Sequence, residues 1–458
     1  MEQEVAIGTP SQRTVLDNGV RVVTESIPGM RSLSIAVSIE CGSADESAEE
    51  AGLSHLCEHL VFQGTSTRSR LRIARQIDDA GGQVGAFTSR DYTCYTAAVL
   101  GEYSFHALDL LGDLVLNPTF PEQALEFEKR AVLAEIARAA DEPSRRAQEL
   151  AWAACWPDHP LGRPIAGSPE LVEGYTREDV IYFFHRHYSP NRTIISAAGN
   201  LKHDEFVSQV QDVFWRMYGE SSRPRVGPAG FHGGAHGVDI PSAQSYFCLA
   251  LPAPEYSSPD RYAVHALCKA LGGNLSSRLF RRLREERGLV YEVSSDYNAY
   301  RGGGLVSIEG SAHPELLAET LGETTAVARD LLTGAEPIEL EELWRVRTQI
   351  RSEHLLSSES THTRMMRLAV QEIYFGRQMP STEILDAVQE LDLEPVHRGG
   401  RQCWGTGPMA ATLVVAGPGG TEAAAAARSL IEETPEPGSP AETLSPSLKT
   451  GKEESACH

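Results

Sequence analysis

Residues 52–62 read Gly52-Leu53-Ser54-His55-Leu56-Cys57-Glu58-His59-Leu60-Val61-Phe62. In a helix, residues three and four apart share a face, so His55, Glu58 and His59 project together while apolar residues pack behind them. Two neutral imidazoles on one face suit a zinc ion, and a neighbouring carboxylate can activate a water molecule. The order His-x-x-Glu-His inverts the metalloprotease motif His-Glu-x-x-His. The alternative is a solvated helix face that carries two histidines by accident.

A catalytic zinc ion needs a third protein ligand and an open position for water. Glu135 is the best candidate, because it lies between apolar residues in a long helix expected over residues 122–140. Glu128 lies two turns earlier on the same face and is expected to hold a ligand histidine through its other ring N–H. An exposed helix face is the alternative interpretation of both glutamates.

Length and composition limit the possible functions. The chain has 458 residues, too many for one ordinary core, and 41% of them are hydrophobic. A formal net charge of −22 argues against nucleic acid as a partner, since phosphate contacts need clustered Lys and Arg. We expect no membrane partner, because no signal peptide or spanning apolar stretch is evident. Scattered cysteines and an Arg-rich, Lys-poor composition favour a cytoplasmic, bacterial protein that contains free thiols.

The order of expected elements recurs in the two halves of the chain. Asn18-Gly19 predicts a hairpin over residues 14–25, and further strands are expected at 32–41, 83–100 and 193–198. In the second half, strands are expected at 245–251, 289–299, 304–310 and 411–416. Helices are expected between the strands of each half. The sequence therefore predicts an α+β fold of two homologous domains, each a mostly antiparallel β-sheet packed with helices.

The expected boundaries follow composition. Residues 1–220 form the domain with the zinc site, 221–238 a Gly/Pro-rich linker, 239–431 the second domain, and 432–458 a disordered tail. His232 and His236 are interpreted as plain linker histidines, because glycines separate them and no carboxylate is near in sequence. His265 stands alone where the second domain repeats the zinc helix, so that domain is not expected to bind metal.

The order and spacing of the motif resemble the pitrilysin/insulinase family of zinc peptidases (inverzincins, family M16). Within it, the chain is similar to the short subfamily that includes mitochondrial processing peptidase. The resemblance covers roughly residues 15–420 and also includes Phe62-Gln63-Gly64-Thr65, His159-Pro160-Leu161-Gly162 and Tyr188-Ser189-Pro190-Asn191. It implies that His55, His59 and Glu135 bind zinc (Zn2+), that Glu58 is the general base, and that Glu128 supports the site.

The resemblance also implies a substrate site drawn from both halves. Arg284 and Tyr291, in Leu283-Arg284-Glu285 and Gly288-Leu289-Val290-Tyr291, match the family residues that grip substrate and polarise the scissile carbonyl. A salt-bridged surface is the alternative for this arginine-rich segment. The edge strand that pairs with substrate usually carries Asn-Ala, and here reads Gly85-Ala86-Phe87. Pairing with a substrate strand uses backbone groups, so it remains possible with Gly85 in place of Asn. Contacts of the Asn side chain are lost.

We therefore expect a zinc-dependent metalloendopeptidase that cleaves peptides or extended segments, such as leader peptides, in a chamber formed by two subunits. The resemblance implies a homodimer or a heterodimer with a related subunit that lacks the zinc motif. One alternative is a weakly catalytic or non-catalytic scaffold or regulatory subunit of such a heterodimer, and Gly85 is the feature that favours it. Another is a small-molecule hydrolase with a chance motif.

Overall fold

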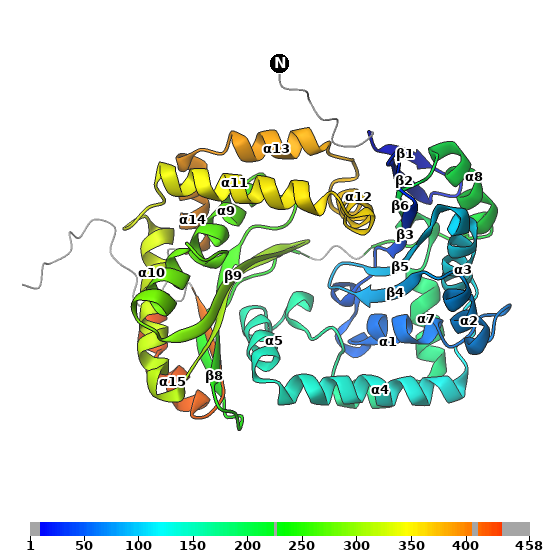
Figure 1. The fold of residues 1–458 in the computed structure, drawn as a ribbon. Helices are drawn as coiled ribbons and strands as arrows, with labels where there is room; N and C mark the ends of the chain where they lie inside the picture. The colour runs from blue at the N-terminus through cyan, green and yellow to red at the C-terminus, as the bar shows by residue number, and fades with distance from the viewer. Residues whose placement is uncertain (1–9, 224–226, 405–410, 433–458) are drawn as a thin grey trace, which may run out of the picture.

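The strands form two separate sheets in this computed structural model, which describes residues 10–223, 227–404 and 411–432. The first sheet has the order β1-β2-β6-β3-β5-β4 and the second the order β7-β11-β8-β10-β9 (Figure 1). The strands of the first sheet are β1 (Gln12–Val15), β2 (Arg21–Ser26), β3 (Ser32–Ile39), β4 (Gln83–Thr88), β5 (Thr93–Leu100) and β6 (Thr193–Gly199). Those of the second are β7 (Gly234–Val238), β8 (Ser245–Ala253), β9 (Val290–Tyr300), β10 (Gly303–Ala312) and β11 (Thr412–Ala416).

Helices surround both sheets. The first half contains α1 (Leu53–Val61), α2 (Arg70–Asp79), α3 (Ser104–Leu116), α4 (Glu122–Asp141), α5 (Pro143–Cys155), α6 (Pro169–Gly174), α7 (Arg177–His187) and α8 (His203–Phe214). The second half contains α9 (Arg261–Gly272), α10 (Leu317–Thr333), α11 (Leu340–Ser357), α12 (Thr361–Phe375), α13 (Ser381–Gln389), α14 (Leu393–Cys403), α15 (Gly420–Ala426) and α16 (Arg428–Glu432). Within the described ranges, none of these helices combines the length and apolarity needed to span a bilayer.

The two sheets repeat one topology, which confirms the prediction of two homologous α+β domains. In each, one strand pairs in parallel with the last strand of the domain, β2 with β6 and β7 with β11. All other neighbouring strands are antiparallel. The predicted first hairpin is also present: Gly19 has φ of 97°, and the Asn18 side chain accepts the N–H of Val20 at 3.2 Å.

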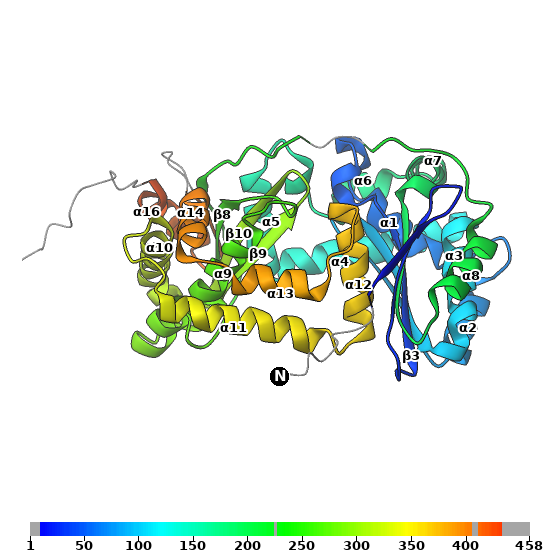
Figure 2. The ribbon, with the colours of Figure 1, turned by 90° about the horizontal axis from the view of Figure 1, so that it is seen from above.

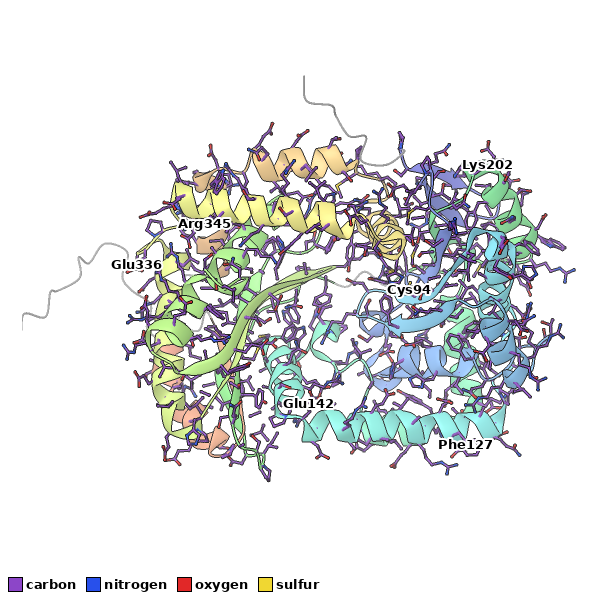
Figure 3. The ribbon with its side chains drawn as sticks, viewed as in Figure 1. Cys94, Phe127, Glu142, Lys202, Glu336 and Arg345 are labelled. Carbon is purple, nitrogen blue, oxygen red and sulfur yellow. The ribbon has the colours of Figure 1, made fainter. Side chains whose placement is uncertain are left out.

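One helix of each domain packs on the sheet of the other domain. Helix α5 packs on β8 and β11 of the second sheet, and α12 packs on β3 and β6 of the first (Figures 1 and 2). Trp152 and Trp156, at the end of α5, are buried against Leu305 and Val414. In return Met365 and Leu368 of α12 join Val23, Ala36, Cys94, Ile194 and Ala198 of the first sheet. Figure 3 labels Cys94 at this contact and Glu142 at the turn from α4 into α5.

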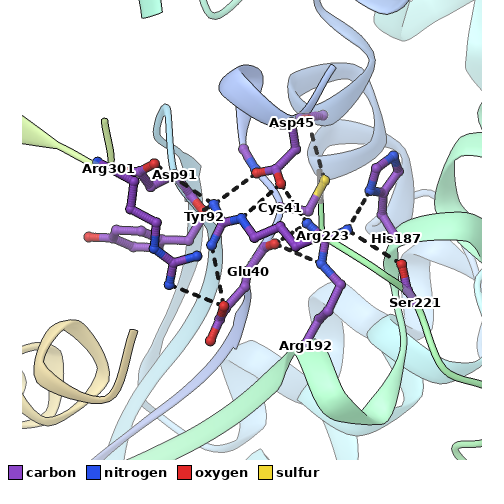
Figure 4. Close-up of polar contacts among 12 residues, drawn as sticks. Glu40, Cys41, Asp45, Asp91, Tyr92, His187, Arg192, Ser221, Arg223 and Arg301 are labelled. Carbon is purple, nitrogen blue, oxygen red and sulfur yellow. Dashed lines mark hydrogen bonds and ion pairs between the residues drawn. The ribbon is translucent and has the colours of Figure 1, made fainter. Parts of the chain in front are cut away.

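A cluster of buried charges joins the two halves where the linker leaves the first domain (Figure 4). Arg223 lies 2.9 Å from Asp45 and 3.3 Å from Glu40. Arg301, from the turn between β9 and β10, lies 3.1 Å from Glu40 and donates its backbone N–H to Asp91 at 3.0 Å. We refer to Glu40, Asp45, Asp91, Arg223 and Arg301 as the seam cluster. It fixes the orientation of the second domain relative to the first.

Some expected elements differ from those observed. The last part of the expected linker, Gly234–Val238, is strand β7, because its glycines allow α15 to approach closely: a Cβ on Gly237 would meet the Gly420 oxygen at 2.2 Å. Between α9 and β9, where a helix is expected, Phe280–Glu286 form a π-helical turn. The expected disordered tail lies outside the described residues apart from Glu432, which ends α16. The residue boundaries of the domains stay predictions.

Candidate metal and substrate site

Helix α1 begins where the backbone cannot accommodate a side chain. Gly52, at its N-terminus, has φ of 100°, and a Cβ there would meet the Ala166 oxygen at 2.7 Å. The buried carboxylate of Glu46 accepts the N–H groups of Gly52 and Ser54 at 2.9 and 2.7 Å. Burial raises the pKa of Glu46 to about 8. This capping role of Glu46 was not predicted from the sequence. The available signal was an acidic residue just ahead of the expected helix.

His55, His59 and Glu135 converge on one point. Leu53, Leu56, Cys57, Leu60 and Val61 anchor one face of α1 in the first core. The other face turns its imidazoles towards α4, which carries Glu135. His55 Nε2 lies 3.7 Å and His59 Nε2 4.0 Å from Glu135 Oε2. Burial, and then the neighbouring His59, lower the pKa of His55 to about 4, so that ring is neutral at pH 7.

The three side chains fit a zinc ion. One ligand atom from each lies within 4.8 Å of the other two, and all three side chains are partly exposed. Ligands about 2.1 Å from zinc at tetrahedral angles lie roughly 3.4 Å apart, so only small side-chain movements are needed. Two imidazoles and one carboxylate are a donor set typical of catalytic zinc and leave a fourth position open. Among the described residues, His55 Nδ1 is buried without a hydrogen-bond partner, so His55 lacks a contact like the one that His59 Nδ1 makes with Glu128.

Glu128 orients the second imidazole. His59 Nδ1 lies 3.0 Å from Glu128 Oε2, so a proton on Nδ1 is donated to the carboxylate and Nε2 keeps its lone pair. Gln63 Nε2 donates to the other oxygen of Glu128 at 2.7 Å and fixes the carboxylate. The chain Gln63–Glu128–His59 therefore sets the tautomer and direction of one ligand. The role of Gln63 was not foreseen, although Phe62-Gln63-Gly64-Thr65 was noted.

Glu58 lies beside the metal ligands without contacting them. Its Oε2 accepts a hydrogen bond of 2.8 Å from the hydroxyl of Thr88, the last residue of edge strand β4. Burial raises the pKa of Glu58, and the hydrogen bond from Thr88 opposes this effect. A half-buried carboxylate with a raised pKa, held in place by one residue of the edge strand, is suited to exchange protons. The contact with Thr88 was not predicted.

Strand β4 leaves one edge of the first sheet unpaired. Its single partner among the described strands is β5, and its residues alternate between exposed and half-buried. Gly85 and Phe87 are on the exposed side, Ala86 on the other, and the Phe87 ring meets Tyr92 edge-to-face at 5.8 Å. A Cβ on Gly85 would touch only Thr96 Oγ1, at 3.8 Å. Packing therefore does not require glycine, and its backbone can pair with an added strand.

Arg284 and Tyr291 meet in the second domain. The guanidinium of Arg284, in the π-helical turn, lies 4.9 Å from the ring centre of Tyr291, the second residue of β9. Tyr291 is 74% exposed. The structure thus joins these two residues to each other, as expected. Among the described residues, however, no hydrogen bond or ion pair joins Arg284 or Tyr291 to His55, Glu58 or His59.

Comparison with known families gives two matches. Residues 21–169 match the model for insulinase (peptidase family M16), and residues 174–350 match the model for the peptidase M16 inactive domain. The second match begins before the expected linker and spans it.

Curated relatives match over most of their length. The chain is 35% identical to the uncharacterized zinc protease YmxG of Bacillus subtilis, over 85% of this chain and 95% of the relative. It is 36% identical to the uncharacterized zinc protease Rv2782c of Mycobacterium tuberculosis, over 84% and 89%.

Solved structures share the fold at low identity. A peptidase M16 inactive domain from Pseudomonas fluorescens superposes with a TM-score of 0.83 at 20% identity, over 90% of this chain and 98% of that one. A protease from Helicobacter pylori gives the same TM-score and identity, over 89% and 100%.

Proposed function

The chain belongs to the insulinase family of peptidases, family M16, and from that premise we propose that it is a zinc-dependent endopeptidase. The observation that carries the proposal is the meeting of three candidate metal-ligand side chains, a half-buried carboxylate and an unpaired strand edge at one place. His55, His59 and Glu135 supply the ligands, Glu58 the carboxylate and β4 the edge. Zinc in this position would lower the pKa of a water molecule and polarise the scissile carbonyl.

Glu58 is the general base in this proposal. It takes a proton from the attacking water and passes it to the leaving amine. Its raised pKa and its place beside the ligands support the assignment. Thr88 donates its hydroxyl to Oε2 of Glu58 and so holds the carboxylate in place for this transfer.

The substrate is an extended peptide that adds to β4 beside Gly85, Ala86 and Phe87, with backbone hydrogen bonds that need no particular side chain. Arg284 and Tyr291 approach from the second domain and hold the carbonyl. Their exposure and mutual stacking support a role that needs domain closure. Leader segments of unfolded proteins are one suitable substrate class. Two chains, identical or related, would enclose the site and exclude folded proteins.

A non-catalytic subunit is the second candidate function. Gly85 is the observation that favours it, because the side chain that relatives place there is missing. The space beside Gly85 and the complete set of ligands favour the enzyme.

Cleavage of quenched peptides by the purified protein separates the two candidates. We expect about one zinc ion per chain and cleavage of extended peptides by the wild type. Glu58→Gln should retain zinc and lower kcat by roughly 10²–10⁴-fold, the usual contribution of a general base. Glu49→Gln, an exposed change just before α1, is the matched control and should keep full activity. Zinc-loaded wild type that cleaves nothing, alone or with a related subunit, would refute the enzyme and support the scaffold.

A further inference from the structure

The common topology of the two domains allows their helices to be matched one to one. Helix α1 follows β3, and α9 follows β8, the strand at the same place in the second sheet. Helices α4 and α11 are likewise equivalent, since each is the second long helix after the hairpin of its domain. The zinc helix α1 therefore has a counterpart in α9, and the helix of Glu135 a counterpart in α11.

Burial fixes the register within these pairs. Aligning His55 with His265 places buried residues of α1 opposite buried residues of α9, and His59 opposite Lys269. Glu353 occupies the same place in α11, counted from its first residue, as Glu135 in α4. The buried pairs are Leu53 and Ala263, Ser54 and Val264, Leu56 and Ala266, Cys57 and Leu267, Leu60 and Ala270, and Val61 and Leu271.

The equivalent residues are also in contact. Lys269 Nζ lies 2.8 Å from Glu353 Oε1, where the first domain has His59 and Glu135. The exposed fractions of the side chains agree: 20% and 54% for Lys269 and Glu353, 19% and 43% for His59 and Glu135. His265 and Glu353 both line one cavity of about 770 Å³. The second domain thus retains one imidazole and the carboxylate of the trio and replaces the other imidazole with an ammonium group.

We propose that the Lys269 ammonium group takes, in the second domain, the place that a metal cation takes in the first. It joins α9 to α11 through Glu353, as the metal joins α1 to α4 through Glu135. An ammonium group has no lone pair and repels a dication, so the second domain excludes zinc. Cys268, a buried residue, stands at the position of α9 that matches Glu58 in α1, so the second domain also lacks the proposed general base. The inference rests on the metal site of the proposed function but not on peptidase activity.

Metal binding by Lys269→His tests the proposal. The background variant carries His55→Ala and His59→Ala, so the first domain holds no zinc. We expect this background to bind no Co²⁺ in equilibrium dialysis. Adding Lys269→His should produce about one bound Co²⁺ per chain with the visible absorption of a tetrahedral site. Adding His265→Ala as well should abolish the gain. A folded Lys269→His protein that binds no Co²⁺ would overturn the proposal.

Hydrogen exchange of the wild-type protein gives a second test. This test remains decisive even when Lys269→His does not fold. Chelation should speed exchange in α1 and α4 but leave α9 and α11 unchanged, because their cation is covalently part of the chain. Lys269→Met should speed exchange in α9 and α11 by about tenfold, and Lys269→Arg should restore protection. Equal loosening of both helix pairs by chelation, or no effect of Lys269→Met, would refute the role. A first domain insensitive to chelation would refute the metal site of the proposed function instead.

Discussion

The two domains share a sheet order and differ in which side chains they place on it. The first presents two imidazoles, three carboxylates and a short unpaired edge strand, β4. The second presents a lysine–glutamate pair and a longer edge strand, β9, that begins beside Arg284 and Tyr291. The backbone is common to both. The two domains therefore differ in a few side chains on equivalent helices, those of α1 and α4 in the first and those of α9 and α11 in the second.

The first prediction concerns a substitution that gives the first site the lysine–glutamate pair of the second. His59→Lys places an ammonium group beside Glu135 in the arrangement that Lys269 and Glu353 already have. Zinc content should fall from about one per chain to less than about one tenth, and peptide cleavage by roughly 10³-fold or more. Elemental analysis and a quenched-peptide assay measure the two effects. Lys269→Arg is the control and should change neither, and a zinc-loaded His59→Lys protein would contradict the assignment of ligands.

The second prediction concerns edge strand β4 and its hydrogen bond to Glu58. Thr88→Val removes the hydroxyl group that donates to Glu58 at 2.8 Å. A hydrogen bond to a charged group contributes about 1.5–3 kcal/mol, so kcat should fall roughly 10–100-fold. KM and zinc content should stay unchanged, because neither the strand nor the ligands are altered, and Thr88→Ser should recover most of the rate. Equal losses in Thr88→Val and Thr88→Ser would show that the hydroxyl does not position Glu58.

The third and smallest effect concerns the response of the first domain to acid. His187 and Cys403 end the equivalent helices α7 and α14, and both are buried. Burial and then the charges of Arg192, Arg186 and Arg223 lower the pKa of His187 to about 3, whereas burial raises the pKa of Cys403 to about 12. Between pH 6.5 and 3 the unfolded chain therefore binds a proton that the folded first domain does not. Stability from neutral His187 is complete above pH 6.5 and is lost as pH falls.

At pH 5.5 this loss is about 1.4 kcal/mol of unfolding free energy in the first domain. Urea unfolding from pH 7 to 5.5 measures it, with hydrogen exchange of backbone amides to separate the domains. His187→Gln should remove about this much of the loss between pH 7 and 5.5, whatever it does to absolute stability. His55 and His354, whose pKa values burial also lowers to about 4, should account for further loss. A wild-type slope unchanged in that variant would exclude His187 as the cause.

The convergence of the candidate metal ligands could be predicted from the sequence, because His55, Glu58 and His59 lie within about one helix turn and Glu135 lies in a long, regular helix. It also predicted the repeated strands. It did not show Thr88 beside Glu58, since that contact depends on how the β4 edge meets α1. Nor did it show Lys269 against Glu353, which joins distant helices.

Helices with poor local propensity were also beyond prediction. Helix α14 contains Pro395, Gly399 and Gly400, residues that disfavour helix in isolation. It forms because these glycines permit close packing: a Cβ on Gly400 would meet the Leu332 oxygen at 3.0 Å. Tertiary contact outweighs local preference there. The same holds for β7, whose glycines indicated a linker.

The exchange of α5 and α12 between the domains sets the order in which a nascent chain can mature. Helix α5 leaves the ribosome long before β8 and β11, so Trp152 and Trp156 stay uncovered for the intervening synthesis. The first sheet in turn awaits Met365 and Leu368. At roughly 5–20 residues per second, this interval lasts on the order of ten seconds or more. The first domain therefore acquires its complete core only after α12 has been translated, so a chain that ends before α12 lacks part of that core.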